Sequence, residues 1–148
     1  MASKFKDNAG REWDLSVHAL TCMAVKTETG IRIERLFADK CKLFNELAED
    51  ASLFSTVLWC MVSEDAAKLG VTKDQFLASL AGDAMYESGI ALGRAVADFH
   101  RADQRAAMNK WLDKAIEAQN ASVANAAAAI ESVTVDEIVT AMGTTDGR

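Results

Sequence analysis

The stretch LGVTKDQFLASLAGDAMYESGIALGRAVADFH, residues 69–100, holds the densest set of helix-boundary signals in the chain. Gly70 is a typical helix end. Thr72 then opens a capping box, because its hydroxyl can accept the amide of Gln75 while the Gln75 side chain reaches back. The pattern predicts the end of one helix followed directly by a short helix to Leu80.

A longer helix is predicted after Gly82, and we expect Asp83 to cap it. Its larger apolar residues recur at helical spacing and form one face: Met85, Leu92, Val96 and Phe99. Gly89, Gly93 and Ala97 lie beside them at four-residue spacing, and such small side chains let another helix approach closely. Charged residues in the same helix exclude a membrane span, so we expect a packing seam between helices in water.

Residues 53–69 form the predicted central helix, which either Asp50 or Ser52 can cap. The first half of this helix is apolar nearly all round, with Phe54, Val57, Leu58, Trp59, Met61 and Val62. A helix of this kind is buried on several sides. The segment therefore predicts the middle of a helical bundle.

A small hairpin is predicted at residues 5–17. Apolar residues at 13, 15 and 17 alternate as in a strand, and the D-N-A-G sequence at 7–10 favours a turn. Because an isolated hairpin is marginally stable in water, its apolar side must pack onto the helices. We expect Trp13 to be the anchor.

Two further helical segments lie between the hairpin and the central helix. Ser16 can cap a helix that ends at Gly30, whose apolar face would consist of Leu20, Met23, Ala24 and Thr27. Residues 31–48 repeat a helical pattern, but charged residues at 39, 40 and 42 interrupt it. This segment predicts either one irregular helix or two short ones.

A long helix is predicted over residues 103–132. Its apolar stripe comprises Met108, Trp111, Leu112, Ala115, Ile116, Val123, Ala127 and Ile130. At ~1.5 Å per residue it would reach about 40 Å, so we expect part of it to project. Its Ala-rich end, 121–129, leaves two interpretations open: a contact with a partner, or a frayed surface helix. A second capping box at 134–137 predicts a last short helix ending at Gly143.

These elements predict a mainly α fold: an N-terminal β-hairpin, then a bundle of about five to seven helices with a long Ala-rich C-terminal helix. A chain of 148 residues with 50% hydrophobic and 26% charged residues can bury one core. We therefore expect one domain over residues 1–142 and a mobile tail at 143–148. The absence of Pro favours helix continuation.

Composition also excludes several classes of function. A net charge of −6 disfavours a nucleic-acid binder, which needs a concentrated basic face. The longest strongly apolar window, residues 53–62, is too short to span a membrane, and the first residues lack an apolar signal-peptide core. We expect a cytoplasmic protein that binds neither nucleic acid nor membrane. Cys22, Cys41 and Cys60 lack zinc-site spacing, so we expect reduced, buried thiols.

Residues that could perform chemistry are few. Neither His18 nor His100 has metal-ligand or nucleophile spacing, and the acidic pairs at 49–50 and 64–65 have no E-x-x-H companion. Glycine-rich phosphate loops and nucleophile elbows are missing from the sequence. Basic residues between Arg94 and Lys114 alternate with acidic ones, as on a solvated face. We expect no enzyme, no cofactor and no metal.

Four segments carry a family resemblance: FKDNAGREWDL (5–15), TETG (27–30), LFSTVLWCMVSEDAAKLGVTKDQFLASLAGDAM (53–85) and ALGRAVADFH (91–100). The resemblance as a whole covers roughly residues 5–114. In their order they resemble small phage and prophage tail assembly chaperones, which are encoded near the tape measure protein. The matching residues cap and pack helices and contain no catalytic signature.

The resemblance implies a non-enzymatic assembly factor in the host cytoplasm. It would bind the aggregation-prone, helical tape measure protein, help the tail tube protein polymerise around it, and be absent from the finished particle. Apolar helical grooves receive amphipathic helices, and Met side chains adapt to several partners. Candidate partner-binding residues are Met85, Gly89, Gly93, Met108, Trp111 and Ile116, each of which could instead belong to the core.

Two other hypotheses remain open on the sequence. The first is a structural virion component, a connector or a minor capsid or tail protein, that uses the long helix for subunit packing. The second is an acidic helical regulator that binds a host protein, which only the net charge and size favour. Self-association is compatible with all three hypotheses.

Overall fold

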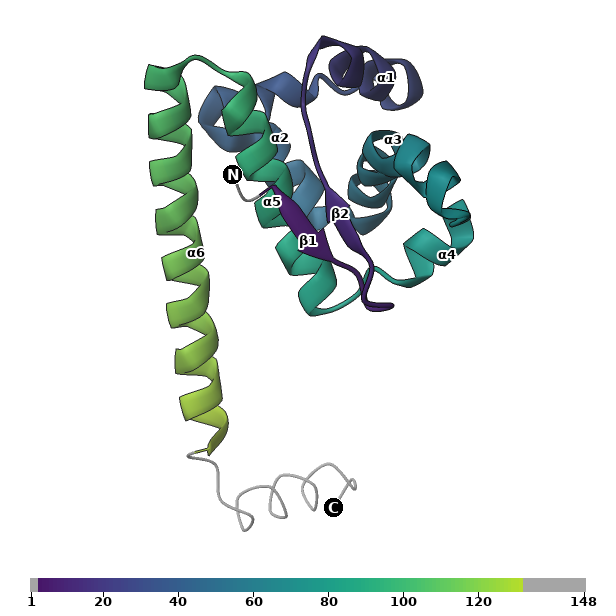
Figure 1. The fold of residues 1–148 in the computed structure, drawn as a ribbon. Helices are drawn as coiled ribbons and strands as arrows, with labels where there is room; N and C mark the ends of the chain where they lie inside the picture. The colour runs from purple at the N-terminus through teal and green to yellow at the C-terminus, as the bar shows by residue number, and fades with distance from the viewer. Residues whose placement is uncertain (1–2, 132–148) are drawn as a thin grey trace, which may run out of the picture. The chain divides into compact units, whose positions relative to one another are not determined.

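The computed structural model describes residues 3–131, in which a two-stranded antiparallel hairpin is followed by six α-helices (Figure 1). This confirms the predicted fold class, including the long last helix. The elements are β1 (Lys4–Lys6), β2 (Glu12–Asp14), α1 (Ala19–Thr29), the 3-10 turn η1 (Ile33–Arg35), α2 (Ala38–Glu49), α3 (Ala51–Leu69), α4 (Lys73–Ala78), α5 (Asp83–Phe99) and α6 (Ala102–Glu131).

The chain divides into two compact units, and the boundary falls inside α6, between Lys110 and Trp111. Within the described residues the second unit is the rest of α6 alone. The predicted capping box at 134–137, the helix end at Gly143 and the tail at 143–148 lie outside the described residues. Across residues 3–131, no helix combines the length and apolarity needed to cross a membrane.

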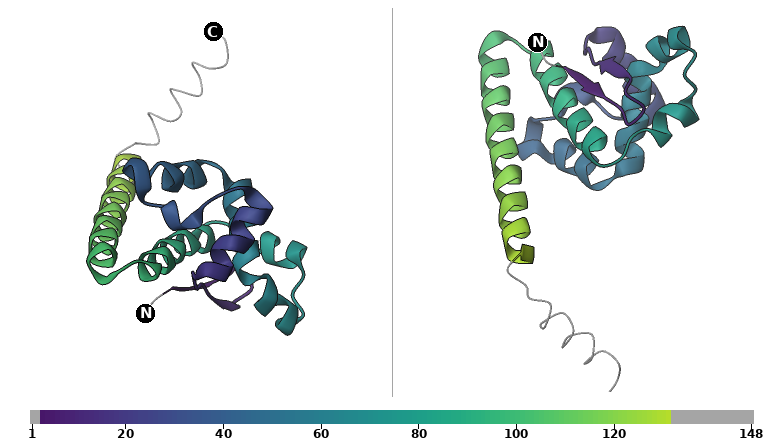
Figure 2. Two further views of the ribbon diagram at one scale, coloured as in Figure 1. Left: turned by 90° about the horizontal axis from the view of Figure 1, so that it is seen from above. Right: turned by 60° about the horizontal axis from the view of Figure 1, so that its bottom comes forward.

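The core of the first unit joins the hairpin to the helices. In the hairpin Phe5 pairs with Trp13, and both side chains are buried. The Trp13 ring meets Phe76 of α4 edge to face, with 5.2 Å between ring centroids. Strand β1 contacts α5, beside which it lies in both views of Figure 2. The role of Trp13 as anchor is thus confirmed.

The turn of the hairpin is organised by the buried carboxylate of Asp7. This carboxylate accepts hydrogen bonds from the Trp13 indole at 2.9 Å and the Arg11 Nε at 2.8 Å, and from the backbone amides of Ala9 and Arg11. Burial alone would raise the pKa of Asp7, but the hydrogen bonds from Trp13 and Arg11 outweigh it and lower that pKa below 3.8. Asp7 therefore links the turn to the core as an ionised group.

Helix α1 corrects two predictions. Its cap is His18, whose Nδ1 accepts the amide of Thr21, and Ser16 lies outside the helix. Its buried side carries Thr21 and Val25, whereas the predicted apolar face is exposed: Leu20 is 68% and Met23 66% exposed. Burying Thr21 costs little because its hydroxyl donates to the Ser16 carbonyl. Helix α1 is too short for the spacing of its apolar residues to show which side is buried. In the structure its contact with α3 decides which side is buried.

The irregular pattern at 31–48 folds as η1 followed by α2. Inside α2 the backbone of Asp39, Lys40 and Cys41 is left-handed, with φ between 54° and 61°. Each such non-glycine residue costs roughly 1–2 kcal/mol relative to a right-handed helix. The break coincides with the charged residues 39 and 40 that interrupt the apolar pattern.

The helix boundaries around α3 and α4 follow the sequence. Asp50 caps α3, accepting the Leu53 amide at 3.0 Å, and Gly70 ends it at a φ of 70°. Both hydrogen bonds of the capping box between Thr72 and Gln75 are present. These capping signals involve residues only a few positions apart, so they set the helix ends regardless of how the helices pack in the fold.

Helix α5 departs from prediction at both ends. Gly82 is its cap residue, with φ 58° and ψ −127°, and Asp83 is the first helical residue. A glycine reaches this backbone conformation without the steric cost of a Cβ atom, which explains why the boundary falls one residue early. At the other end Phe99 is 40% exposed, so it does not continue the buried face of Leu92 and Val96.

Candidate protein-binding surface

The predicted seam of small residues on α5 is largely buried in the structure. Gly93 and Ala97 are buried, and Gly89 is half-buried. A Cβ atom at Gly89 would lie 3.9 Å from Cζ of Phe54 on α3. Met85 is also half-buried and packs against the core. The α5 members of the predicted partner site thus face their own chain.

Among the α6 members of that site, Trp111 is the most accessible. Met108 and Ile116 are half-buried, and Trp111 is 37% exposed. Met108 belongs to the first unit, while Trp111 and Ile116 belong to the second. From Glu117 to Ile130 every residue is exposed.

One face of α6 repeats uncharged residues along the helix, and all of them except Gln119 are apolar or small. Steps of four and three residues place Leu112, Ile116, Gln119, Val123, Ala126 and Ile130 on this side, which we call the α6 stripe. Leu112 is buried and Ile116 half-buried, whereas Val123 is 57% and Ile130 73% exposed. The stripe therefore presents its two large C-terminal side chains to solvent.

The exposed part of α6 also lacks charge. From Ala118 to Ile130 the sequence contains no Asp, Glu, Lys or Arg, and Ala is the commonest residue. Solvent-facing helices usually carry charged residues on their outer sides. A partner could cover this surface without removing any charged side chain from water, which avoids the main desolvation penalty of an interface. Val123 and Ile130 were missing from the predicted partner residues, although the charge-free run marks them.

The histidines of the chain have structural contacts. His18 caps α1, and Nε2 of His100 lies 2.9 Å from the carbonyl oxygen of Glu34. Within residues 3–131, no three His, Cys, Asp or Glu side chains gather as a metal site would require. The histidines described here thus act as a helix cap and as a contact to a backbone carbonyl.

The three cysteines are free thiols. Cys41 is buried, and Cys22 and Cys60 are half-buried. Burial raises the pKa of each, and nearby carboxylates, Glu34 beside Cys22 and Glu28 beside Cys60, raise two of them further. Thiols with raised pKa stay protonated at neutral pH and are poor nucleophiles.

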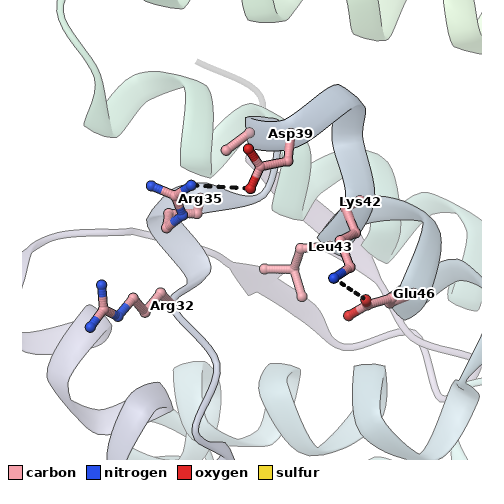
Figure 3. Close-up of a pocket in the computed structure, with 7 residues that line it drawn as sticks. Arg32, Arg35, Asp39, Lys42, Leu43 and Glu46 are labelled. Atoms are coloured by element: carbon pink, nitrogen blue, oxygen red, sulfur yellow. Dashed lines mark hydrogen bonds and ion pairs between the residues drawn. The ribbon is translucent and has the colours of Figure 1, made fainter.

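A shallow surface pocket of about 240 Å³ lies along η1 and α2 (Figure 3). Its charges are paired within it: Arg35 contacts Asp39 at 3.2 Å and Lys42 contacts Glu46 at 3.9 Å. Arg32 adds a further cation to the lining, and Leu43 lies between the two pairs. Because two of its three cations are paired with carboxylates, the pocket carries little net charge, and the α6 stripe is the stronger candidate surface.

Comparison with known proteins adds no relative. No family model matches the chain, and no curated protein or solved structure matches it either. The resemblance to tail assembly chaperones therefore has the sequence segments quoted above as its support.

Proposed function

We propose that this protein is a non-enzymatic tail assembly chaperone of a phage or prophage. It binds the helical tape measure protein in the host cytoplasm and assists tail tube assembly around it. The observation that carries the proposal is the exposed, uncharged α6 stripe with Val123 and Ile130. The family resemblance supplies the identity of the client.

The physical basis is packing between helices. A tape measure helix with an apolar side can lie along the α6 stripe, as amphipathic helices do in apolar grooves. Alanines beside Val123 let the two backbones approach closely. Fully burying a Val or Ile side chain contributes about 1.5–3 kcal/mol, so Val123 and Ile130 would supply much of the affinity.

A second apolar surface, on α1, is available in the first unit. Leu20 and Met23 are both about two-thirds exposed on the outer side of that helix. Met side chains adapt to partners of different shape. A chaperone that covers a long client can use such a surface for additional, less specific contacts.

Co-expression with the tape measure protein of the same genome tests the proposal. The wild-type chain should bring the tape measure protein into the soluble fraction as a complex. A variant with Val123→Glu and Ile130→Glu should lose it, because binding would then bury two carboxylates. The matched control, Ala121→Glu with Ala128→Glu, places the same charges at the same spacing on the opposite face and should keep the complex.

Two outcomes contradict the proposal. One is an insoluble tape measure protein with the wild-type chain together with normal tails in a deletion mutant. The other is the stoichiometric presence of the chain in purified particles by mass spectrometry, which identifies a structural virion component. Recovery of one host enzyme, and no phage protein, from lysate would favour the regulator hypothesis.

A further inference from the structure

The α6 stripe has the spacing of a coiled-coil seam. Ile116, Val123 and Ile130 recur every seven residues and occupy the a positions of a heptad, with Gln119 and Ala126 at the d positions. All three a residues are β-branched. In two-stranded parallel coiled coils, β-branched residues are favoured at a.

The positions flanking this seam are small or uncharged. Ala115, Ser122 and Ala129 occupy the g positions, and Asn120 and Ala127 the e positions that follow Ile116 and Val123. Two identical chains with a net charge of −6 repel each other over most of their surfaces. Residues 118–130 carry no charged side chain, so this segment of one copy does not repel the same segment of the other copy.

We propose that a second copy of this chain covers the α6 stripe when no client is bound, through a short parallel pair of α6 helices. Each a residue then meets its own counterpart, and the two Gln119 side amides share a layer where they can hydrogen-bond. An antiparallel pair centred on Val123 would place Gln119 opposite Ala127 and leave that amide unpaired. A polar residue in the seam thus specifies the parallel register, as buried amides do in other coiled coils.

The pair is expected to be weak. From Ile116 to Ile130 the seam is about 21 Å long, and Ala126 fills a position where Leu would bury much more surface. Standard stable interfaces bury roughly 800 Å² on each partner, more than a helix seam of this length provides. We expect a dissociation constant of about 100 μM, so that a client helix can displace the second copy.

Analytical ultracentrifugation of the protein alone tests the pairing. The apparent mass should rise from 16.0 kDa toward twice that value as concentration passes through the 100 μM range. Ala126→Leu should tighten the dimer at least tenfold. Val123→Glu with Ile130→Glu should stay monomeric with unchanged helicity by circular dichroism, while Ala121→Glu with Ala128→Glu should dimerise like the wild type.

Wild-type and Ala126→Leu proteins that remain monomeric at every concentration would overturn the inference. So would dimerisation that survives the Val123 and Ile130 replacements, or that the opposite-face control abolishes. Because these measurements need no client, their failure leaves the co-expression result standing, and a failed co-expression leaves the dimer standing.

Oxidative cross-linking tests the orientation. In a parallel pair the thiols of an Ile130→Cys variant lie next to each other and should form a disulfide between copies under a mild oxidant. In an antiparallel pair they would be about 21 Å apart along the helix axis, because each would lie beside Ile116 of the other copy and on opposite sides of Val123. Ala128→Cys, on the outer face, is the matched control and should not cross-link. Equal cross-linking of both variants, or of neither, would refute the parallel arrangement.

Discussion

Helices α5 and α6 use similar small residues with opposite results. In α5 small side chains are buried, among them Ala91, Gly93 and Ala95, and the helix contacts β1 and η1. In α6 the alanines from 121 to 129 are exposed. Charge separates the two: the exposed side of α5 carries residues such as Glu87 and Asp98, whereas Ala118–Ile130 carries none. The comparison teaches that small residues alone do not decide whether a helix is buried, and that the exposed sides of the two helices differ in charge.

The largest expected effect is on the buried side of α5. Leu92→Ala removes a nearly fully buried side chain and leaves a cavity, so the free energy of unfolding should fall by about 2–5 kcal/mol. Urea unfolding followed by circular dichroism measures the change. A loss below 1 kcal/mol would show that α5 is not packed as described.

A second test removes the carboxylate that organises the hairpin turn and binds the Trp13 indole. Asp7→Ala leaves the buried Trp13 indole without its acceptor and should lower the free energy of unfolding by about 2–3 kcal/mol. The control is Asp14→Ala, an exposed carboxylate of the same hairpin, which should change stability by less than about 0.5 kcal/mol.

The difference between wild type and Asp7→Ala should also depend on pH. The pKa of Asp7 is lower in the folded protein than its ordinary value of 3.8, so its ionisation stabilises the fold above that value. This contribution is lost as pH falls through the folded pKa. The gap between the unfolding midpoints of the wild type and Asp7→Ala should stay constant as pH falls from neutral. It should become smaller once the pH is below 3.8. A gap that widens there would contradict the ionised state of Asp7.

Adding bulk should distinguish the two helices by the size of the destabilisation. Ala95→Leu in α5 overpacks a buried position and should destabilise the protein by about 1–3 kcal/mol. Ala126→Leu in α6 adds the same atoms to an exposed position and should leave the stability of the dilute monomer within about 0.5 kcal/mol. Thermal unfolding at low protein concentration measures both, and equal destabilisation would remove the distinction.

The smallest effect is expected at Val123. Val123→Ala trims an exposed side chain and improves helix propensity, so the free energy of unfolding should change by less than about 0.5 kcal/mol. Client binding should weaken nevertheless. If stability drops by 2 kcal/mol or more in dilute solution, Val123 is covered by its own chain and cannot be a free binding surface.

Much of the fold could be predicted because its signals are local. The Thr72–Gln75 capping box, the Gly30 and Gly70 helix ends and the alternation around Trp13 each depend on residues a few positions apart. The irregularity at 39–41 was also visible as an interrupted pattern. The partner site was less predictable, since Gly89 and Gly93 share the small-residue signature of α6 but lie against their own chain.

The sequence by itself determined most of the helix ends, the hairpin and the long C-terminal helix with its uncharged end, because caps, turns and composition act over one or two helical turns. Tertiary structure alone decided which faces are buried. It turned Leu20 and Met23 of α1 outward, made Asp7 a buried acceptor for Trp13, and covered the α5 seam. The physical reason is that burial depends on which surfaces meet across the fold, a property that no short stretch of residues contains.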